Sequence, residues 1–278
     1  MILDGKIVSE KIKKDLLNEI NEMEVKPTLS VILLGHSKES LSYINMKRRM
    51  CESLGIKFIL QHFDEKVEEC IVLKEIQTLN EDKDVDGILI QLPLPVHFNK
   101  DKLLQEISYE KDVDGFHTIN AGKLFQNRDI NIIPCTPQGC IDMIDYYDIN
   151  VEGLTIAIIG TSNLVGLPLS MLLLQRGATI SLCNINTKDI KLHTIEADMV
   201  ITCCGVANMV KSDWIKQGVI IIDIGINHIE DKLVGDVDFA DVYEKCSYIT
   251  PVPGGVGPMT VISLMKNLVK LTKNNLNI

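Results

Sequence analysis

The 278-residue sequence lacks several features that would assign it to a specialised class of protein. Its 28 Lys and Arg residues are outnumbered by 38 Asp and Glu residues, and the net charge of −10 argues against a nucleic acid or an anionic membrane surface as a partner. It has no apolar run near the roughly 20 residues that span a bilayer. Residues 1–14 carry charges and lack the apolar core of a signal peptide. We therefore expect a cytoplasmic protein.

The chain also lacks any cysteine pattern that would indicate a metal site or a redox motif. Its eight cysteines include no C-x-x-C pair, and none stands at zinc-finger spacing from a histidine. Several lie in apolar runs, as Cys203 and Cys204 do in M-V-I-T-C-C-G. Reduced thiols in such runs behave as small apolar side chains of a core. The sequence therefore predicts no disulfide and no bound metal.

What is present is the composition of an ordinary globular protein, with enough chain for about two domains. Hydrophobic residues make up 46% of the sequence and charged residues 24%, as in typical folded domains. A domain usually takes roughly 150 residues, so the length of this chain favours two domains over one.

Strand-like and helix-like patterns alternate along both halves of the chain. Short apolar runs bounded by glycine or proline suit buried parallel strands, and the segments between them have helical periodicity. Strands are expected at 28–35, 56–63, 85–93, 155–160, 178–184, 197–205 and 218–225, and helices at 7–23, 38–54, 67–80, 161–176 after an initial loop, and about 259–273. This rhythm predicts an α/β protein with parallel sheets covered by helices, divided near Pro134–Pro137.

A glycine-containing loop follows the strand expected at 155–160. The run from Gly160 to Gly166 joins this strand to a helix, and a helix N-terminus after such a turn can hold a pyrophosphate. Ser162 and Val165 replace the second and third glycines of the dinucleotide fingerprint. The run therefore indicates a dinucleotide site, and the alternative is a tight turn that binds no ligand.

The residues after the next strand bear on the choice of dinucleotide. A site that prefers NAD often carries Asp or Glu there, on the ribose hydroxyls. This chain has Asn184, which favours NADP, but it has no arginine nearby for a 2′-phosphate, and Lys188 is the nearest basic residue. The preference between NADP and NAD stays open at this point.

One lysine falls on the apolar face of an expected helix. Ser40, Tyr43, Lys47, Met50 and Leu54 are spaced by three and four residues, so all five lie along one stripe. Burial favours the neutral form of an amine and makes it a candidate general acid or base. Tyr43, one turn earlier, can stack or form a hydrogen bond beside it. The alternative is a lysine that extends to solvent while Tyr43 packs in the core.

Three further features stand where ligands bind in parallel sheets, beyond the carboxyl ends of strands. Gln91 follows one strand, and its amide both donates and accepts hydrogen bonds. Asp112 and Asp114 precede a glycine turn. In the run 250–260, prolines stiffen the chain and glycines let the backbone approach a ligand. The alternatives are a solvated glutamine, a solvated acidic turn and an irregular loop.

These motifs together resemble the bifunctional methylenetetrahydrofolate dehydrogenase/methenyltetrahydrofolate cyclohydrolase family. The motifs are S-x-x-Y-x-x-x-K (40–47), Q-L-P-L-P (91–95), K-D-V-D-G (111–115), P-C-T-P (134–137), G-D-V (235–237) and I-T-P-V-P-G-G-V-G-P-M-T (249–260). The resemblance covers the whole chain in order, and the last motif is the most specific. It shifts the interpretation of Lys47 from packing to function.

The resemblance implies two α/β domains flanking a cleft. A folate-binding catalytic domain would comprise residues 1–137 and 259–278, because the last helix returns to it, and residues 138–258 would form a Rossmann-like NAD(P)-binding domain. The implied chemistry is oxidation of 5,10-methylenetetrahydrofolate to 5,10-methenyltetrahydrofolate with NADP, followed by hydrolysis to 10-formyltetrahydrofolate. Family members are usually homodimers, so the expected partners are tetrahydrofolate derivatives and a second copy of the chain.

The resemblance also implies roles for individual side chains. Lys47 would be the acid/base of the hydrolytic step, Gln91 would bond to it and tune its protonation, and Tyr43 would stack on the folate. Asp112 would hold the pterin ring, with Asp114 as the second candidate. The further residues implied to contact the folate are Ile90, Leu92, Pro253, Gly254, Gly255, Val256 and Gly257.

The cofactor is implied to bind to the second domain. Gly160, Thr161 and Ser162 would carry its phosphates, and Ile185 and Ile226 would lie beside it, with Ile226 near the nicotinamide. Many family members have an arginine, or a serine with a basic partner, near the 2′-phosphate, whereas this chain has Thr161 and the run Asn-Ile-Asn at 184–186. NAD is therefore an alternative cofactor.

Two alternative functions fit parts of the sequence. One is a monofunctional, NAD-dependent methylenetetrahydrofolate dehydrogenase, against which the presence of Lys47, Tyr43 and Gln91 argues. The other is a nucleotide-binding module without catalysis, because a fold does not by itself fix a function. Such a module would be expected to have lost site residues, and every family motif that can be placed is intact.

Overall fold

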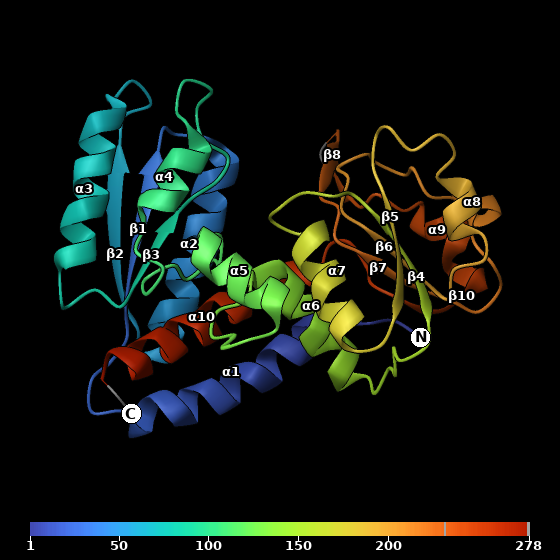
Figure 1. Ribbon diagram of the computed structural model, residues 1–278, viewed down its shortest axis with the longest axis horizontal. Coiled ribbons are helices and arrows are strands. Elements are labelled where there is room, and N and C mark those ends of the chain that lie inside the picture. Colours follow the sequence, from blue (N-terminus) through green and yellow to red (C-terminus); the bar gives the residue numbers. More distant parts are fainter. Residues whose placement is uncertain (231, 277–278) are drawn as a thin grey trace. The chain divides into compact units, whose positions relative to one another are not determined.

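The computed structural model describes residues 1–230 and 232–276, and the chain forms two compact units. Unit 1 comprises Met1–Lys11 and Thr136–Thr260, and unit 2 comprises Ile12–Cys135 and Val261–Ile278. Each unit contains a parallel sheet with helices packed on it (Figure 1). The expected α/β class is confirmed.

The N-terminal residues belong to a different unit from the one expected. We expected residues 1–137 to stay together, but Met1–Lys11 is part of unit 1. The reason is backbone pairing: Ile2 forms a parallel bridge with Ile249, and the Leu3 amide donates to the Ile249 carbonyl at 2.8 Å. The first residues are therefore fixed to a strand of the unit 1 sheet.

The sheet of unit 2 has three parallel strands in the order β2-β1-β3. They are β1 (Thr28–Leu34), β2 (Lys57–Phe63) and β3 (Gly87–Ile90). Every residue of the central strand β1 is buried, as expected for an apolar strand covered on both faces. The backbone between Lys111 and Val113 extends this sheet, because the Ile88 amide donates to the Lys111 carbonyl at 2.8 Å.

Helices cover both faces of the unit 2 sheet. The connections from β1 to β2 and from β2 to β3 run in opposite directions across the sheet. Connections between parallel strands are as a rule right-handed, which places α2 (Lys38–Leu54) and α3 (Glu69–Glu81) on opposite faces. The face that carries Ile32 packs against α3 and α4 (Lys100–Glu106). The helix α2 begins after Ser37, whose hydroxyl accepts the Ser40 amide at 3.1 Å.

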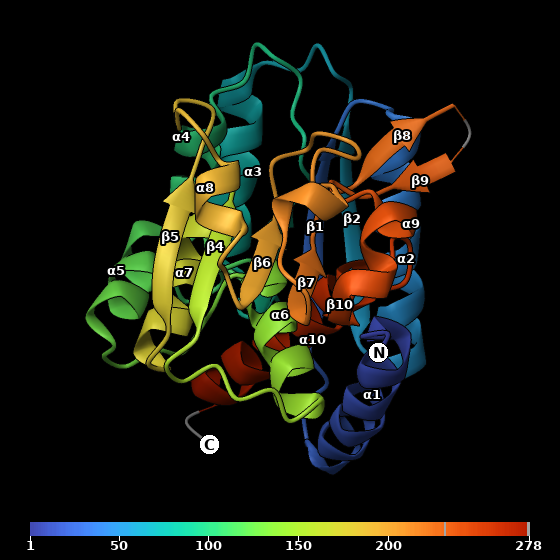
Figure 2. The ribbon, with the colours of Figure 1, turned by 90° about the vertical axis from the view of Figure 1, so that its right-hand side faces the viewer.

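The sheet of unit 1 has five parallel strands in the order β10-β7-β6-β4-β5 (Figure 2). They are β4 (Thr155–Ile159), β5 (Thr179–Cys183), β6 (Met199–Thr202), β7 (Val219–Asp223) and β10 (Cys246–Ile249). The chain leaves β4 to one side and returns to its other side with β6, so the strand order reverses at β4. Open α/β sheets bind ligands beyond the carboxyl ends of the strands at such a reversal.

The remaining elements connect the strands or join the units. In unit 2 the chain also forms α5 (Thr118–Gln126). In and around unit 1 it forms α6 (Cys135–Tyr146), α7 (Gly166–Gln175), α8 (Lys191–Thr194), α9 (Phe239–Val242), the 3-10 turns η1 (Ser212–Trp214) and η2 (Tyr243–Lys245), and the hairpin β8 (Asn227–Ile229) and β9 (Lys232–Val234). The helices α1 (Gly5–Glu22) and α10 (Val256–Asn275) each begin in unit 1 and continue into unit 2.

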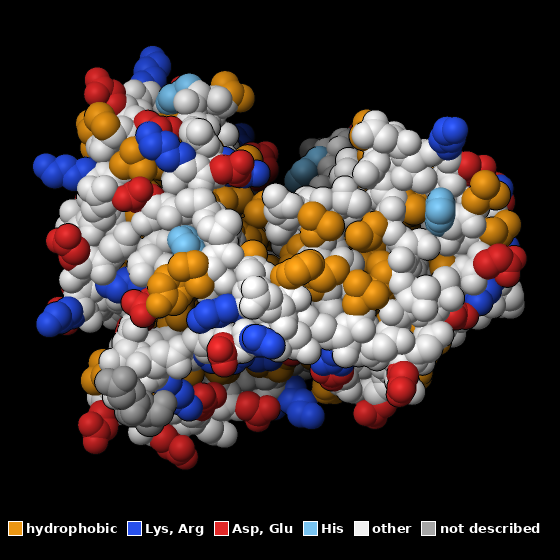
Figure 3. Space-filling view, in the orientation of Figure 1, with side chains coloured by type: hydrophobic (Ala, Val, Ile, Leu, Met, Phe, Trp, Pro, Cys, Tyr) orange, Lys and Arg blue, Asp and Glu red, His pale blue; other side chains and the backbone are white. Residues whose placement is uncertain are grey.

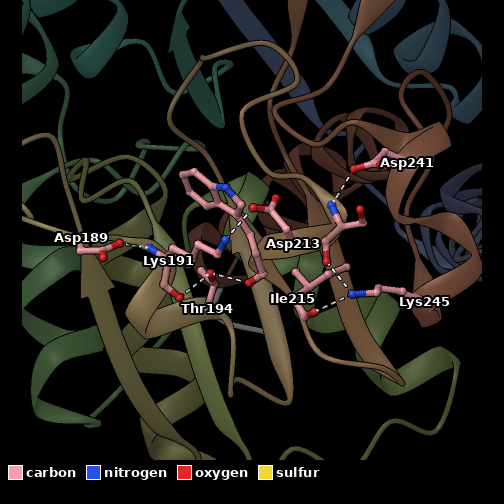
Figure 4. A network of polar contacts seen from close by, with 9 residues as sticks. Asp189, Lys191, Thr194, Asp213, Ile215, Asp241 and Lys245 are labelled. Atoms are coloured by element: carbon pink, nitrogen blue, oxygen red, sulfur yellow. Dashed lines mark hydrogen bonds and ion pairs between the residues drawn. The ribbon is translucent and has the colours of Figure 1, made fainter.

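A network of polar contacts joins the short elements of unit 1 (Figure 4). The Lys191 ammonium lies 2.6 Å from the Asp213 carboxylate, and the Asp241 carboxylate accepts the Ser212 amide at 2.7 Å. The Lys245 ammonium donates to the Ser212 carbonyl at 2.7 Å. These contacts fix α8, η1, α9 and η2 to one another, although exposed ion pairs of this kind add only about 0–1 kcal/mol each.

The eight cysteines are free thiols. Seven are buried or partly buried, but Cys70 of α3 is exposed, so the expectation of a core role is wrong for that residue.

Among the described helices, none combines the length and the apolar character needed to cross a membrane.

Asn267 of α10 tests what fixes that helix within unit 2. Its buried side chain donates to the Val113 and Ile133 carbonyls at 2.9 and 2.8 Å. Asn267→Leu removes the Nδ2 group that makes both bonds; the Val113 carbonyl keeps the Cys135 thiol, but the Ile133 carbonyl loses its described partner, which costs about 1–3 kcal/mol. We expect a clear fall in the urea midpoint of unfolding. Lys273→Ala, which removes an exposed ion pair with Glu19, is the control and should lower the midpoint much less.

Candidate active site

Lys47 lies at the border of the buried face of α2. The most buried residues of this helix are Ser40, Ile44, Cys51 and Leu54. The expected stripe is therefore shifted, because Tyr43, Lys47 and Met50 are only partly buried and flank it. A lysine at this border keeps its amine within reach of groups on other elements while its stem packs on the helix face.

Gln91 holds the Lys47 amine. Gln91 directly follows β3, its side chain is 6% exposed, and its Oε1 accepts a hydrogen bond from Lys47 Nζ at 2.9 Å. Its Nε2 donates to the Leu92 carbonyl at 2.6 Å, and its backbone amide donates to the Ile32 carbonyl. With its amide group fixed at both atoms, Gln91 presents an acceptor to Lys47. The contact that the resemblance implied is therefore present.

The electrostatic surroundings of Lys47 favour a readily released proton. Burial lowers the pKa of the Lys47 amine, and the negative charge of Asp114 partly opposes this effect. Burial likewise raises the pKa of the Asp114 carboxyl, and the Lys47 charge partly opposes that shift. The amine and the carboxyl are thus coupled through the same buried space, which is the arrangement expected for groups that exchange protons with a ligand.

The structure distinguishes Asp112 from Asp114. Asp112 is 3% exposed, and its Oδ1 accepts the Gly115 amide at 3.0 Å. Its Oδ2 accepts the His117 amide at 2.8 Å and the Asn120 side chain at 2.9 Å. These donors make Asp112 the organiser of the turn. The Asp114 carboxyl instead interacts with the Lys47 charge and with the Cys135 thiol.

Cys135 is a neighbour of this cluster that sequence reasoning did not assign. Burial raises the pKa of the Cys135 thiol well above its ordinary value, with a further contribution from the Asp114 charge. Its Sγ donates to the Val113 carbonyl at 3.4 Å. The motif P-C-T-P at 134–137 was the available signal, but a single buried cysteine gives no indication of its neighbours. Its thiol forms a hydrogen bond with the Asp114 carboxyl and interacts with the Lys47 charge.

Three other residues expected to contact folate differ in exposure. Tyr43 is partly buried, and burial raises the pKa of its hydroxyl. Leu92 is partly exposed and follows Gln91. The Ile90 side chain is 1% exposed and belongs to the core beneath the sheet, so any contact of this residue with a ligand would be through its backbone.

In unit 1, a compact loop joins β4 to α7. Gly160 has φ +118°, and a Cβ there would lie 2.5 Å from the Cys203 carbonyl oxygen. A Cβ on Gly166 would lie 1.9 Å from the Gly160 carbonyl oxygen. The loops after β4 and β6 therefore touch through backbone, and only glycine fits at both positions. The Ser162 hydroxyl accepts the Val165 amide at 3.2 Å, which shapes the turn before α7.

The other residues expected near the cofactor lie on exposed turns at the carboxyl edge of the unit 1 sheet. Ile185 follows β5 and is 97% exposed, and Ile226 follows β7 and is 44% exposed. The turn after β5 is fixed locally, because the Asn184 amide donates to the Thr187 hydroxyl and the Asn186 amide donates to the Asn184 side chain, both at 2.9 Å.

The loop before α10 is held by its own backbone. The Gly255 amide donates to the Pro251 carbonyl at 2.8 Å, and a Cβ on Gly255 would lie 2.6 Å from that oxygen. Gly254 has φ +108°, a conformation that favours glycine. Pro253 and Gly257 are exposed, while Val256 is buried. The residues 253–257 belong to unit 1, whereas Lys47, Gln91 and Asp114 belong to unit 2.

Comparison with known proteins supports both halves of this description. The family model "Tetrahydrofolate dehydrogenase/cyclohydrolase, catalytic domain" matches residues 3–114, and the model of the "NAD(P)-binding domain" of the same family matches residues 134–276. The bifunctional protein FolD of Campylobacter jejuni is 47% identical over 280 residues, which cover 99% of each chain. The chain belongs to the tetrahydrofolate dehydrogenase/cyclohydrolase family.

Solved structures of the tetrahydrofolate dehydrogenase/cyclohydrolase family have the same fold. The crystal structure of the bifunctional enzyme from Campylobacter jejuni aligns with a TM-score of 0.97 at 47% identity and covers 99% of each chain. A structure of the enzyme from Trypanosoma brucei, described as complexed with NADP cofactor and inhibitor, aligns with a TM-score of 0.96 at 31% identity and covers 100% of this chain and 99% of that one. The resemblance inferred from the motifs is confirmed.

The division of the family into two domains agrees with the position of the two sites. Lys47, Gln91, Asp112 and Asp114 all fall in the part that matches the catalytic domain, and the loop after β4 falls in the part that matches the NAD(P)-binding domain. Within the described residues, no three His, Cys, Asp or Glu side chains gather as a metal site.

The different roles of the two aspartates give a direct test. Asp112→Ala leaves the Gly115 and His117 amides and the Asn120 side chain without their acceptor, and each desolvated donor costs about 1–3 kcal/mol. We expect Asp112→Ala to lower the urea midpoint of unfolding markedly. Asp114→Ala should lower it less, because the Lys47 amine, which loses the opposing charge, can release its proton, as burial already favours. Equal destabilisation by the two variants would contradict this assignment.

Proposed function

We propose that this protein is a bifunctional folate enzyme that carries out two consecutive reactions. It oxidises 5,10-methylenetetrahydrofolate to 5,10-methenyltetrahydrofolate with NADP, and it hydrolyses that product to 10-formyltetrahydrofolate. The observation that carries the proposal is the hydrogen bond of 2.9 Å from Lys47 to Gln91, beside the Asp114 carboxyl. Hydride transfer alone requires no such proton-handling group, whereas hydrolysis does.

The oxidation depends mainly on alignment. A C–H bond of the methylene carbon breaks, its electron pair leaves with the hydrogen as hydride, and a cationic methenyl bridge remains. NADP supplies the hydride acceptor when it is bound. The part of this chain is to hold the two reactants: Gly160, Thr161 and Ser162 with the N-terminus of α7 suit the cofactor phosphates, and Ile226 suits the nicotinamide.

The hydrolysis depends on a group that takes and returns a proton. Water adds to the methenyl carbon and loses a proton. The bond from that carbon to N5 of the folate then breaks as N5 gains a proton, and the new hydroxyl loses its own proton to give the formyl C=O, so one proton is released overall. Lys47 suits these transfers, because burial lowers the pKa of its amine. Gln91 keeps the amine oriented, and Tyr43 offers a ring for the folate to stack on.

We assign the carboxylate that binds the pterin to Asp114 rather than Asp112. The oxygens of Asp112 already accept three hydrogen bonds from its own turn, so a ligand would have to displace one of them. Asp114 lies beside Lys47 without this commitment to the turn. The pterin ring and the methenyl carbon of the substrate would then both lie against residues of unit 2, namely Asp114 and Lys47.

NADP is the proposed cofactor, and NAD is the alternative. NADP accompanies the solved relative from Trypanosoma brucei. Thr161 and the turn at 184–186 offer no arginine to the 2′-phosphate, which distinguishes NADP from NAD. Kinetic constants measured for both dinucleotides in one assay therefore test the preference directly.

The proposal also includes that the protein acts in the cytoplasm as a homodimer. Figure 3 shows exposed apolar side chains gathered over α7, and Leu167, Leu174 and Leu182 are 38%, 45% and 39% exposed on α7 and β5. In the described sheet, β5 is an edge strand with β4 as its neighbour. Apolar side chains beside an open strand edge favour association.

Sedimentation equilibrium tests the homodimer. We expect a mass near twice the 31.1 kDa of the chain, because the apolar surface of α7 and β5 would be covered by a second copy. A mass equal to that of one chain at micromolar concentrations would contradict the dimer while leaving the catalytic proposal in place.

A two-wavelength absorbance assay tests the catalytic proposal. Purified protein is mixed with methylenetetrahydrofolate and either NADP or NAD, and the reduced cofactor and the methenyl product are followed separately. We expect reduced cofactor to accumulate while methenyl product stays low. Reduced cofactor with persistent methenyl product would indicate a monofunctional dehydrogenase, and the absence of both signals would indicate a nucleotide-binding module.

Lys47→Met separates the two activities. The variant keeps the length of the side chain but removes the amine, so cyclohydrolase activity should fall by roughly 10²- to 10⁴-fold, the usual contribution of a general acid/base. Dehydrogenase activity should fall much less, because hydride transfer depends on alignment. Equal and mild losses of both activities would overturn the role of Lys47.

A further inference from the structure

The turns at the carboxyl edge of the unit 1 sheet are tied together by two buried aspartates. Asp223 is the last residue of β7, and Asp236 follows the hairpin of β8 and β9. They are 4% and 0% exposed. Neither was assigned a role from the sequence, where Asp236 appeared only as the centre of the G-D-V motif. Buried carboxylates are retained where several donors converge on them.

Asp223 joins the ends of three neighbouring strands. Its Oδ1 accepts the Thr202 hydroxyl at the end of β6 at 2.9 Å and the Gly225 amide at 3.0 Å. Its backbone amide donates to the Thr250 hydroxyl, which follows β10, at 2.7 Å. Burial raises the pKa of Asp223 to about 6.

The Asp223 carboxylate also holds Asp236 in place. The Asp236 amide donates to Asp223 Oδ1 and the Val237 amide to Asp223 Oδ2, both at 3.0 Å. The residue before Asp236 must be glycine, because a Cβ on Gly235 would lie 1.8 Å from Asp223 Oδ2. A Cβ on Gly225 would lie 2.2 Å from Asp236 Oδ1.

Asp236 in turn holds the turns that follow β6 and β7. Its Oδ2 accepts the Cys204 amide at 2.8 Å, the Gly205 amide at 3.1 Å and the Cys204 thiol at 3.4 Å. Its Oδ1 accepts the Asn227 side chain at 2.9 Å. One carboxylate thus fixes the backbone after β6 and the residue next to Ile226 after β7.

These two turns lie on the nicotinamide side of the proposed dinucleotide site. In a doubly wound sheet the pyrophosphate lies at the turn after the first strand, and the adenosine ribose lies at the end of the second strand. Here those strands are β4 and β5, so the adenosine half lies over β5. In the order β7-β6-β4-β5, the other half of the cofactor extends over β6 and β7.

We infer that Asp236 is a positioning residue of the dehydrogenase reaction, which sets the turns after β6 and β7 in the geometry that receives the nicotinamide half of the cofactor. The inference rests on the proposed function. Asp236 is fully buried, and its carboxylate accepts the Cys204 and Gly205 amides and the Asn227 side chain, so it acts through these groups. The hydrolytic step uses no dinucleotide and provides an internal control.

The test compares Asp236→Ala with Asp236→Asn. In the alanine variant, the Cys204 and Gly205 amides lose their acceptor and the turn relaxes. We expect the KM for NADP to rise, or kcat of the dehydrogenase to fall, by roughly 10- to 100-fold, the usual effect of a small misplacement. Cyclohydrolase activity, measured with methenyltetrahydrofolate and no dinucleotide, should stay close to that of the wild type.

The asparagine variant should restore most of the lost function. Its amide oxygen can accept the Cys204 and Gly205 amides, and its NH₂ group can donate to Asn227 once the Asn227 amide turns over. An asparagine variant as impaired in dinucleotide use as the alanine variant would contradict the role of Asp236 as an acceptor for these turns.

Asp198→Ala is the matched control. The Asp198 carboxylate also joins neighbouring segments of the unit 1 sheet, because it accepts the Thr155 amide at 2.8 Å and lies 2.6 Å from the Lys216 ammonium, but it does so at the amino ends of β4 and β6. We expect this variant to lower the midpoint of thermal unfolding without raising the KM for NADP. If Asp198→Ala and Asp236→Ala raised that KM equally, the inference would be wrong.

Calorimetric titration with NADP separates failure of the inference from failure of the proposed function. A wild-type protein that binds NADP beside an Asp236→Ala variant that binds it equally tightly, with an unchanged kcat, overturns the inference alone. Parallel loss of both enzymatic activities in Asp236→Ala has the same meaning. A wild-type protein that binds no dinucleotide overturns the proposed function and the inference with it.

Discussion

The burial of the Lys47 amine is the constraint on which the candidate site depends. An amine removed from water keeps its proton only where other groups supply an acceptor and a negative charge. Gln91 supplies the acceptor from the end of β3, and Asp114 supplies the charge from the segment beside that strand. Gln91 is itself held by the carbonyls of Ile32 and Leu92. The buried amine of Lys47 therefore depends on groups from three elements: its own helix α2, the end of β3 and the acidic turn that contains Asp114.

In unit 1, buried polar groups and close backbone contacts hold the turns at the carboxyl edge of the sheet. Its ligand edge consists of turns after strands, and turns have few apolar contacts that would hold them in one geometry. Glycines allow the backbone of the Gly160 loop to touch the Cys203 turn, and the buried carboxylates of Asp223 and Asp236 join the turns after β6, β7 and β10. Close backbone packing and charged acceptors take the place of a hydrophobic core at this edge.

Much of the fold could be predicted because its signals are local. The helix α2 was expected at 38–54 and is observed at Lys38–Leu54, since serine and glycine caps bound a periodic segment. The helices α4–α6 and the hairpin of β8 and β9 were not predicted. The segments of α4, α5 and the hairpin are short, so periodicity gives a weak signal there, and tertiary contacts such as the bond from the Thr118 amide to the Gln105 side chain stabilise α4 and α5. The helix α6 is longer and has buried apolar residues, but it begins where the sequence was divided into two domains.

The sequence alone determined the fold class, the family and the residue types of both sites, because those depend on patterns and motifs along the chain. Only the tertiary structure showed which contacts each of two neighbouring aspartates makes. The sequence does not distinguish Asp112 from Asp114. In the structure, the Gly115 and His117 amides donate to Asp112, whereas Asp114 interacts with Lys47. Likewise, the Cys204 and Gly205 amides that donate to Asp236 lie 32 and 31 residues away in the chain, so no local pattern predicts these contacts.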